Sequence, residues 1–220
     1  MSIDTVPMVP RYGLVDRDYG LRLATTAPEA DGPVHMCNLM KYRARADYGD
    51  ESGGGISGRE ADDRYAPVDV LRAIGAAVCF TADVVEASED WDRVGVVRYP
   101  TRRSFIDMQR RDDFREKHVH KDAGMDHTIV LGTVPVAGLP GAGAGALVVL
   151  ELWTYAAPPS PPAGVATAGA AAFTVEGTIV GDGRRWTGCR YGIATGPVDL
   201  ASATPDHQIL VLRPTIERWR

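Results

Sequence analysis

The feature that most constrains the fold of this chain is a spacing that occurs twice along it. In the first half, Val84-Val85 is followed by five residues and Trp91, and in the second half, Ile179-Val180 is followed by five residues and Trp186. Each pair of apolar residues ends a strand-like run, each tryptophan opens the next one, and a proline follows both. Self-similar spacing is typical of duplicated supersecondary units. The sequence therefore predicts two related units in tandem.

The first unit is expected over residues 34–134. Apolar or alternating runs typical of β-strands occur at 34–42, 76–86, 91–99 and 126–134. Helical periodicity occurs at 57–74 and 101–120. The resulting order, βαββαβ, is that of a ferredoxin-like unit.

The start of the first expected helix has a specific signal. Ser57 and Glu60 have the spacing of a capping box, in which each side chain bonds the backbone N–H of the other residue. Pro67 lies inside this helical stretch and either kinks one helix or starts a second one. Ser57 is thus interpreted as a cap, because no nucleophile motif surrounds it.

The second unit is expected over residues 146–220, after a linker at 135–145. It repeats the four strands, at 146–155, 171–180, 186–194 and 207–213. Its helices are missing, because a proline-rich stretch and a short loop occupy the corresponding positions. Residues 1–33 are expected to form an extended arm. The fold class is α+β: tandem ferredoxin-like units that form one intramolecular barrel, the second unit largely without helices.

A sheet without helices exposes a face that must be covered. The N-terminal arm, the proline-rich stretch and a second copy of the chain are the three candidates. We therefore expect a homodimer.

Composition excludes several classes of function. The net charge is -5 and no basic stripe occurs, so we expect no nucleic-acid partner. The three cysteines are far apart and no zinc motif is present, so we expect buried thiols and no metal site. No apolar run is long enough to span a membrane, and we expect a cytoplasmic protein without membrane contact.

Four short motifs in residues 34–134 resemble bacterial proteins of the dimeric α/β-barrel superfamily, in an uncharacterised branch with a domain of unknown function. The motifs are Asn38-Leu39-x-Lys41-Tyr42, Gly58–Ala61, Trp91-Asp92 with Tyr99-Pro100-x-Arg102, and His120-Lys121-x-Ala123-Gly124-Met125. The second half has none of them.

The resemblance implies a fold more than a reaction. Members of the superfamily include cofactor-free mono-oxygenases, polyketide cyclases, muconolactone isomerases and haem enzymes such as chlorite dismutase. In the smaller members the substrate pocket lies between the sheet and the helices. Only the first unit has helices, so the resemblance places the pocket there.

Three residues are the catalytic candidates. His120 has the right ordinary pKa for a general base, although a histidine at a helix end also serves simply to complement the helix dipole. Asn38 and Lys41 lie three apart on one strand and should face opposite sides of it. For Lys41 a salt bridge at the strand end is the alternative interpretation.

Six further residues are expected to bind the substrate, with the hydrophobic core as the alternative for the aromatic ones. They are Tyr65, Trp91, Tyr99, Arg102, Phe105 and His118.

The function expected from these residues is a cofactor-independent acid–base cyclase, isomerase or lyase acting on an aromatic or polyketide-like molecule. A cofactor-free mono-oxygenase is a close alternative. A haem enzyme of the chlorite dismutase type is another, with His118, His120 or His127 as the axial ligand. The third alternative is a binding protein without catalysis.

Overall fold

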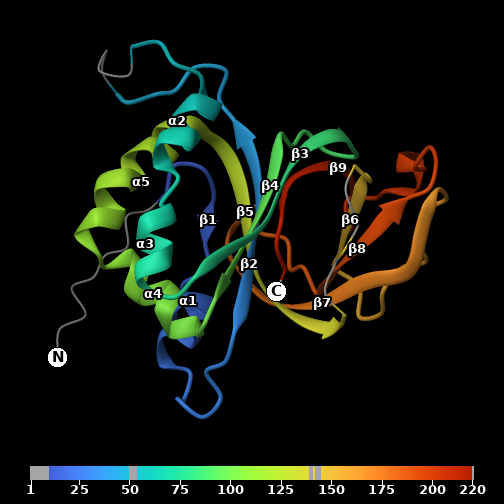
Figure 1. The fold of residues 1–220 in the computed structure, drawn as a ribbon, viewed down its shortest axis with the longest axis horizontal. Helices are drawn as coiled ribbons and strands as arrows, with labels where there is room; N and C mark the ends of the chain where they lie inside the picture. Colours follow the sequence, from blue (N-terminus) through green and yellow to red (C-terminus); the bar gives the residue numbers. More distant parts are fainter. Residues whose placement is uncertain (1–9, 50–53, 139–140, 142–144, 220) are drawn as a thin grey trace.

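The computed structural model describes residues 10–49, 54–138, 141 and 145–219 (Figure 1). The first unit has the expected strand and helix order, with its strands close to the expected bounds. Its elements are β2 (Val34–Tyr42), α2 (Gly58–Tyr65), α3 (Val68–Ala73), β3 (Ala77–Ala87), β4 (Arg93–Tyr99), α4 (Arg102–Gln109), α5 (Asp112–Gly124) and β5 (Met125–Ala137).

The second unit consists of strands and one short 3-10 helix. Its elements are β6 (Val148–Trp153), β7 (Val165–Gly181), β8 (Gly188–Ala194), η2 (Leu200–Ser202) and β9 (His207–Glu217). The expected loss of both helices is confirmed, and β7 is longer at its start than the sequence indicated.

All strands form one antiparallel sheet, in the order β1-β7-β5-β2-β4-β3-β9-β6-β8, and a pairing of β7 with β8 closes it into a barrel. Within each unit the first strand lies between the fourth and the third, and the second lies outside the third. The units meet twice, through β5 with β7 and through β3 with β9. The intramolecular barrel of two ferredoxin-like units is thus confirmed.

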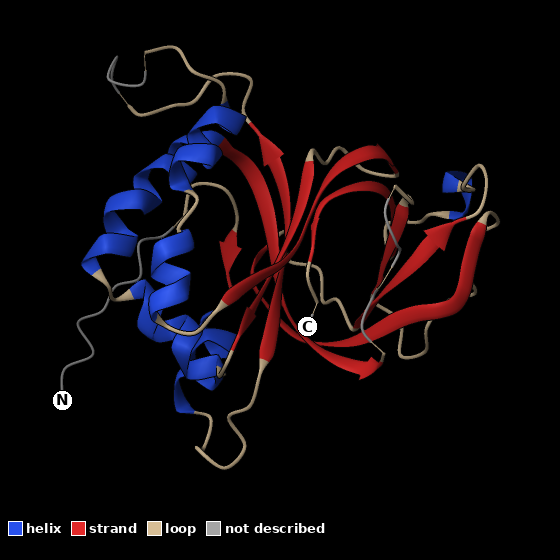
Figure 2. Cartoon of the chain, in the orientation of Figure 1, coloured by secondary structure: helices blue, strands red, loops and turns tan. Residues whose placement is uncertain are grey.

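The barrel separates two apolar regions. Along β2, Cys37 and Leu39 point into the barrel, while Val34 and Met36 face the helices, as the two-residue period of a strand requires. All five α-helices of the described residues lie on the outside of the first unit (Figure 2). The α-helices therefore cover the outer face of the sheet on the side of the first unit.

Both expected helical regions of the first unit are broken into two helices. Pro67 starts a second helix rather than kinking one, since α2 ends at Tyr65 and α3 begins at Val68. The capping box is confirmed: Glu60 N donates to Ser57 Oγ at 3.2 Å, and Ser57 N donates to Glu60 Oε2 at 2.7 Å.

The arm is not extended throughout, and this expectation was wrong. It contains a two-residue strand, β1 (Leu14–Val15), and a helix, α1 (Arg17–Thr25), which Asp16 caps through the N–H of Tyr19 at 2.8 Å. The helix docks because the Tyr19 ring lies against Gly132 and Gly177, where any Cβ would collide with it. The signal for this helix lies in tertiary packing, which periodicity does not show.

The outer face of the second sheet is closed by the chain itself. Glu151 is fully buried there and accepts from Arg190 at 2.8 and 2.7 Å, with His207 Nε2 at 3.3 Å. Arg190 also donates to the carbonyl of Pro159 in the proline-rich stretch at 3.2 Å. That stretch, one of the three candidates, therefore helps to cover this face. The homodimer stays a prediction. The uncovered face that suggested it is not present in the structure, because the chain itself covers that face.

In the part of the chain that the structure describes, no helix has both the length and the apolar character needed to cross a membrane.

Candidate functional site

Six polar or aromatic side chains meet between the helices and the sheet of the first unit. We call this group the Lys121 cluster. It consists of Tyr12, Tyr42, Asp62, Tyr65, His118 and Lys121.

The cluster forms where two helices cross closely. Asp62 and Tyr65 lie one turn apart on α2, and His118 and Lys121 lie one turn apart on α5, so each pair shares a helix face. The crossing depends on Gly58 and Gly124, since a Cβ on either would collide with the backbone of the other. Both glycines belong to motifs identified in the sequence.

The remaining two side chains come from the sheet and the arm. Tyr42, at the end of β2, donates its hydroxyl hydrogen bond to Asp62 Oδ2 at 2.7 Å. The Tyr12 hydroxyl lies 3.0 Å from His118 Nε2. The arm is held over α5 by Arg11, whose side chain donates to Asp122 at 2.9 Å. The arm therefore forms one wall of the cluster.

Lys121 has an unusual environment for a charged side chain. It is only 7% exposed, and its ammonium group makes no hydrogen bond or ion pair to any residue that the structure describes. Its neighbours are aromatic faces: Nζ lies 5.3 Å from the centre of the Tyr65 ring and 5.8 Å from that of Tyr12.

The cluster also contains a fully buried polar atom without a partner. His118 Nδ1 is buried without a hydrogen bond among the described residues. Buried polar groups are nearly always hydrogen-bonded, and an unpaired one costs free energy. The unpaired His118 Nδ1, together with the unpaired Lys121 ammonium nearby, indicates a place for a polar molecule, either a ligand or water.

The ionisable groups of the cluster are shifted towards their neutral forms. Burial lowers the pKa of Lys121, against the attraction of Asp62. Burial raises the pKa of Asp62, although the Tyr42 hydroxyl and Lys121 oppose this. Burial, with Lys121 nearby, lowers the pKa of His118 to about 4. An acid with a raised pKa close to a base with a lowered pKa is the arrangement that acid–base catalysis uses.

Two of the residues expected from the sequence lie in this cluster, namely Tyr65 and His118. Their rings are 6.2 Å apart and perpendicular. Phe114, one turn before His118, adds a further apolar wall with its ring 5.5 Å from that of the histidine.

The three catalytic candidates lie elsewhere. His120 is half-buried beside a loop, with Nδ1 2.8 Å from the Tyr48 hydroxyl. Lys41 makes ion pairs with Asp90 at 2.7 Å and Asp92 at 3.2 Å, which is the salt bridge considered as the alternative. Asn38 is on the helix-facing side of β2, where its amide donates to the Met36 carbonyl at 3.0 Å.

The other expected binding residues have structural contacts. Trp91 points into the barrel and donates from Nε1 to Gln208 at 3.0 Å. Tyr99 and Phe105 pack edge to face in the core under the helices. Arg102 donates from Nε to Glu176 at 2.9 Å. The structure does not bring these four side chains together.

Sequence reasoning missed Lys121, Asp62, Tyr42 and Tyr12 as site residues. Lys121 and Tyr42 belong to quoted motifs, but nothing in the sequence indicates that the lysine is buried. Tyr12 is brought to His118 by a contact between segments 106 residues apart.

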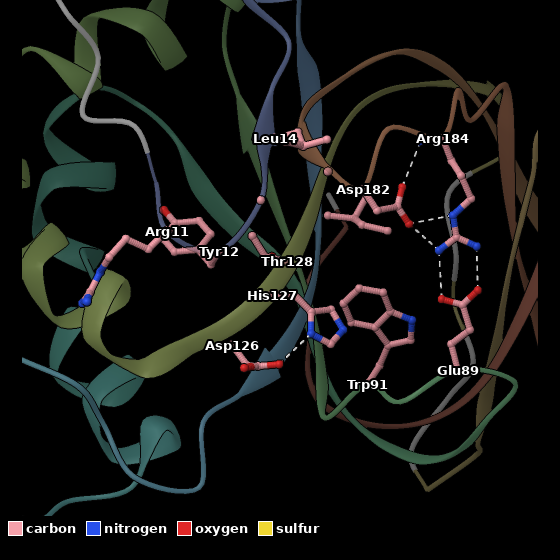
Figure 3. Close-up of a pocket in the computed structure, with 13 residues that line it drawn as sticks. Arg11, Tyr12, Leu14, Glu89, Trp91, Asp126, His127, Thr128, Asp182 and Arg184 are labelled. Atoms are coloured by element: carbon pink, nitrogen blue, oxygen red, sulfur yellow. Dashed lines mark hydrogen bonds and ion pairs between the residues drawn. The ribbon is translucent and has the colours of Figure 1, made fainter.

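A shallow groove of about 640 Å³ lies next to the cluster at one end of the barrel (Figure 3). Tyr12 lines this groove and also belongs to the Lys121 cluster. Trp91, Asp126 and His127 also line the groove. The ring centres of His127 and Trp91 are 4.8 Å apart, and Asp126 Oδ2 lies 3.0 Å from His127 Nδ1. The Arg184 side chain donates hydrogen bonds to the carboxylates of Glu89 and Asp182, as Figure 3 shows.

The three histidines considered as haem ligands lie in different surroundings, and His118 is the most enclosed of them. Its Nε2 is hydrogen-bonded to the Tyr12 hydroxyl, and the rings of Tyr12, Tyr65 and Phe114 lie around it. His120 and His127 have separate, more exposed surroundings. In the described residues, no group of three or more histidine, cysteine or carboxylate side chains has a metal-binding arrangement.

Comparison with sequence-family models and with curated proteins gives no match. Among solved structures, the chain is similar to a protein of unknown function from Rhodopseudomonas palustris, with 24% identity over 55% of this chain and 94% of that one, at a TM-score of 0.48. A mutant chlorite dismutase from Candidatus Nitrospira defluvii is 9% identical over 83% and 91%, at 0.41. A candidate monooxygenase from Fusobacterium nucleatum is 10% identical over 83% and 92%, at 0.43.

The repeated spacing in the sequence predicted two tandem ferredoxin-like units, and the strand order contains both units and their closure. The chain therefore folds as two ferredoxin-like units that close into one α+β barrel within a single polypeptide.

Proposed function

We propose that this chain is an enzyme that moves protons on a small carbonyl compound, and that the Lys121 cluster is its active site. The observation that carries the proposal is the buried Lys121 ammonium without a hydrogen-bond partner among the described residues. Keeping such a group unpaired is costly unless a ligand completes the site.

The roles follow from the surroundings of each group. Lys121, with its lowered pKa, is the base that removes a proton next to the substrate carbonyl. Asp62, with its raised pKa, is the acid that returns a proton. The Tyr12 hydroxyl and His118 are hydrogen-bonded to each other and would relay a proton on the side of the cluster that the N-terminal arm covers.

The aromatic walls suggest the substrate class. The rings of Tyr65, Phe114 and Tyr12 lie around His118, and those of Tyr65 and Tyr12 also lie beside Lys121. Such walls suit a flat, apolar substrate with one or two polar oxygens. This supports an aromatic or polyketide-like carbonyl compound, and a reaction of the isomerase or cyclase type without a cofactor. Tyr65 is half-buried, so the cluster reaches the surface there.

Exchange of carbon-bound hydrogen tests the proposal without the natural substrate. Acetophenone in D₂O exchanges its methyl hydrogens slowly, and a positioned base accelerates this step. We expect the protein to accelerate deuterium uptake, measured by proton NMR, by about 100-fold, the usual contribution of one general base. Lys121→Met should remove the acceleration.

The matched control is Lys117→Met, one turn earlier on α5. Lys117 donates to the Ala66 carbonyl at 3.4 Å and lies outside the cluster, so its variant should keep the full rate. Equal exchange in wild type and Lys121→Met would contradict the proposal. Saturable binding of acetophenone without exchange would indicate a binding protein instead.

A further inference from the structure

The chain uses lysine very sparingly. Of 24 lysine and arginine residues, only Lys41, Lys117 and Lys121 are lysines. Arginine stays protonated in proteins, whereas a buried lysine can lose its proton and become a nucleophile. The position at which a rare lysine is buried is therefore informative about chemistry.

The three lysines have different surroundings. Lys41 is held between two carboxylates, Asp90 and Asp92. Lys117, in the middle of α5, donates to the backbone carbonyl of Ala66, the residue that follows α2. Lys121 alone among them has neither an ion pair nor a hydrogen bond to the described residues, and it is enclosed by the rings of Tyr12 and Tyr65.

We propose that the Lys121 amine forms an imine with the carbonyl carbon of an aryl ketone, an inference that rests on the proposed function of the same cluster. The Lys121 side chain is buried, its amine is unpaired among the described residues and lies over two aromatic rings, and the Asp62 carboxyl is near enough to interact with its charge. An imine at this position makes the lysine a covalent catalyst rather than only a base.

The step balances within the cluster. Nζ of the neutral amine attacks the carbonyl carbon, and a proton moves from nitrogen to oxygen to give a carbinolamine. The C–O bond then breaks as the Asp62 carboxyl protonates the departing hydroxyl, which leaves as water. The products are a protonated imine and the Asp62 carboxylate, so the net charge of the pair is unchanged.

The groups around Lys121 suit both halves of this step. Asp62 is held by the Tyr42 hydroxyl at 2.7 Å, which fixes the carboxyl in the enclosure. The unpaired His118 Nδ1 is a hydrogen-bond site for the carbonyl oxygen. After the step, the cationic imine keeps the position of the ammonium between two aromatic faces, and the carboxylate formed on Asp62 balances its charge.

Reductive trapping tests the inference. Wild-type protein is incubated with acetophenone and sodium cyanoborohydride, and adducts are counted by intact-mass measurement and located by peptide mass spectrometry. We expect one adduct per chain, with the mass of the probe less its oxygen atom, on Lys121. Lys121→Arg, which keeps the charge but is not a nucleophile, should give none, and Lys117→Arg should give the wild-type result.

The outcomes separate the imine from the wider proposal. Accelerated deuterium exchange without a Lys121 adduct would overturn the imine and leave Lys121 as a base. Neither exchange nor adduct would overturn both proposals. Adducts spread equally over Lys41, Lys117 and Lys121 would show ordinary surface reactivity and also overturn the imine. If Lys121→Arg does not fold by circular dichroism, Lys121→Met replaces it, with the same expected absence of adduct.

Discussion

At the residue scale, the chemistry of the cluster is decided by burial. Lys121 and His120 are neighbours in one motif, and the sequence made the histidine the better base. In the structure, His120 faces Tyr48 at the surface side, whereas Lys121 points under the helices. The motif therefore indicated the correct turn of α5. It did not indicate which of its side chains is buried, because α5 has no clear apolar stripe that defines its buried face.

The neutral state of His118 has a consequence for stability at low pH. Its pKa is about 4 in the folded protein and about 6.5 in the unfolded chain, so only the unfolded chain takes up the proton between these values. The stabilisation is thus complete above about pH 6.5 and is lost as the pH falls towards 4, by about 3 kcal/mol. Urea unfolding at pH 7 and pH 4.5 measures this loss.

His118→Asn should show a smaller loss between the two pH values than wild type. His35, buried in the barrel with its pKa also lowered to about 4, remains and accounts for a residual loss. His127→Asn is the control, because this ring is half exposed. An unchanged pH dependence in His118→Asn would mean that His118 is not kept neutral.

At the element scale, the strands were predictable and the helix placement was not. The strand β2 has the bounds that its apolar run indicated, because its residues are buried on both faces. The capping box placed the start of α2 correctly. The crossing of α2 and α5 depends on Gly58 and Gly124, and a glycine in a sequence does not tell which backbone approaches it.

Gly124→Ala should separate the two helices. The new Cβ would meet the Gly58 carbonyl, so α2 has to move away from α5. We expect a loss of about 1–3 kcal/mol in the free energy of unfolding, typical of overpacking, together with loss of the Lys121 trapping reaction. Gly32→Ala is the matched control, since nothing lies within 4 Å of its added Cβ. A Gly124→Ala protein with wild-type stability and trapping would contradict this account of the crossing.

At the scale of the whole molecule, the second unit completes the barrel that the first unit begins. Trp219, after β9, packs against Phe80 of the first unit at 5.4 Å and against Tyr191 of the second at 5.2 Å. The duplicated spacing in the sequence predicted this architecture because it marks the same hairpin in each unit. The covering of the outer face was less predictable, since it depends on the buried Glu151 and Arg190 pair.

A core shared by both units predicts a single unfolding transition. We expect tryptophan fluorescence and far-ultraviolet circular dichroism to give the same urea midpoint. Trp219→Ala should lower that midpoint for both signals together, at a cost of about 3–5 kcal/mol. Two separate transitions, of which only one shifts in the variant, would show that the units are energetically independent.

The ionisation of Lys121 shows directly whether it is the buried, activated amine that the proposed chemistry requires. With only three lysines in the chain, isotope labelling of the lysine side chains gives three resolvable NMR signals, and Lys121→Met identifies the one of interest. We predict that the Lys121 signal titrates below the ordinary pKa of 10.5, because burial opposes its charge, and that the Lys41 signal titrates above it, because Asp90 and Asp92 bind that ammonium. A Lys121 signal that titrates at or above 10.5 would contradict the account.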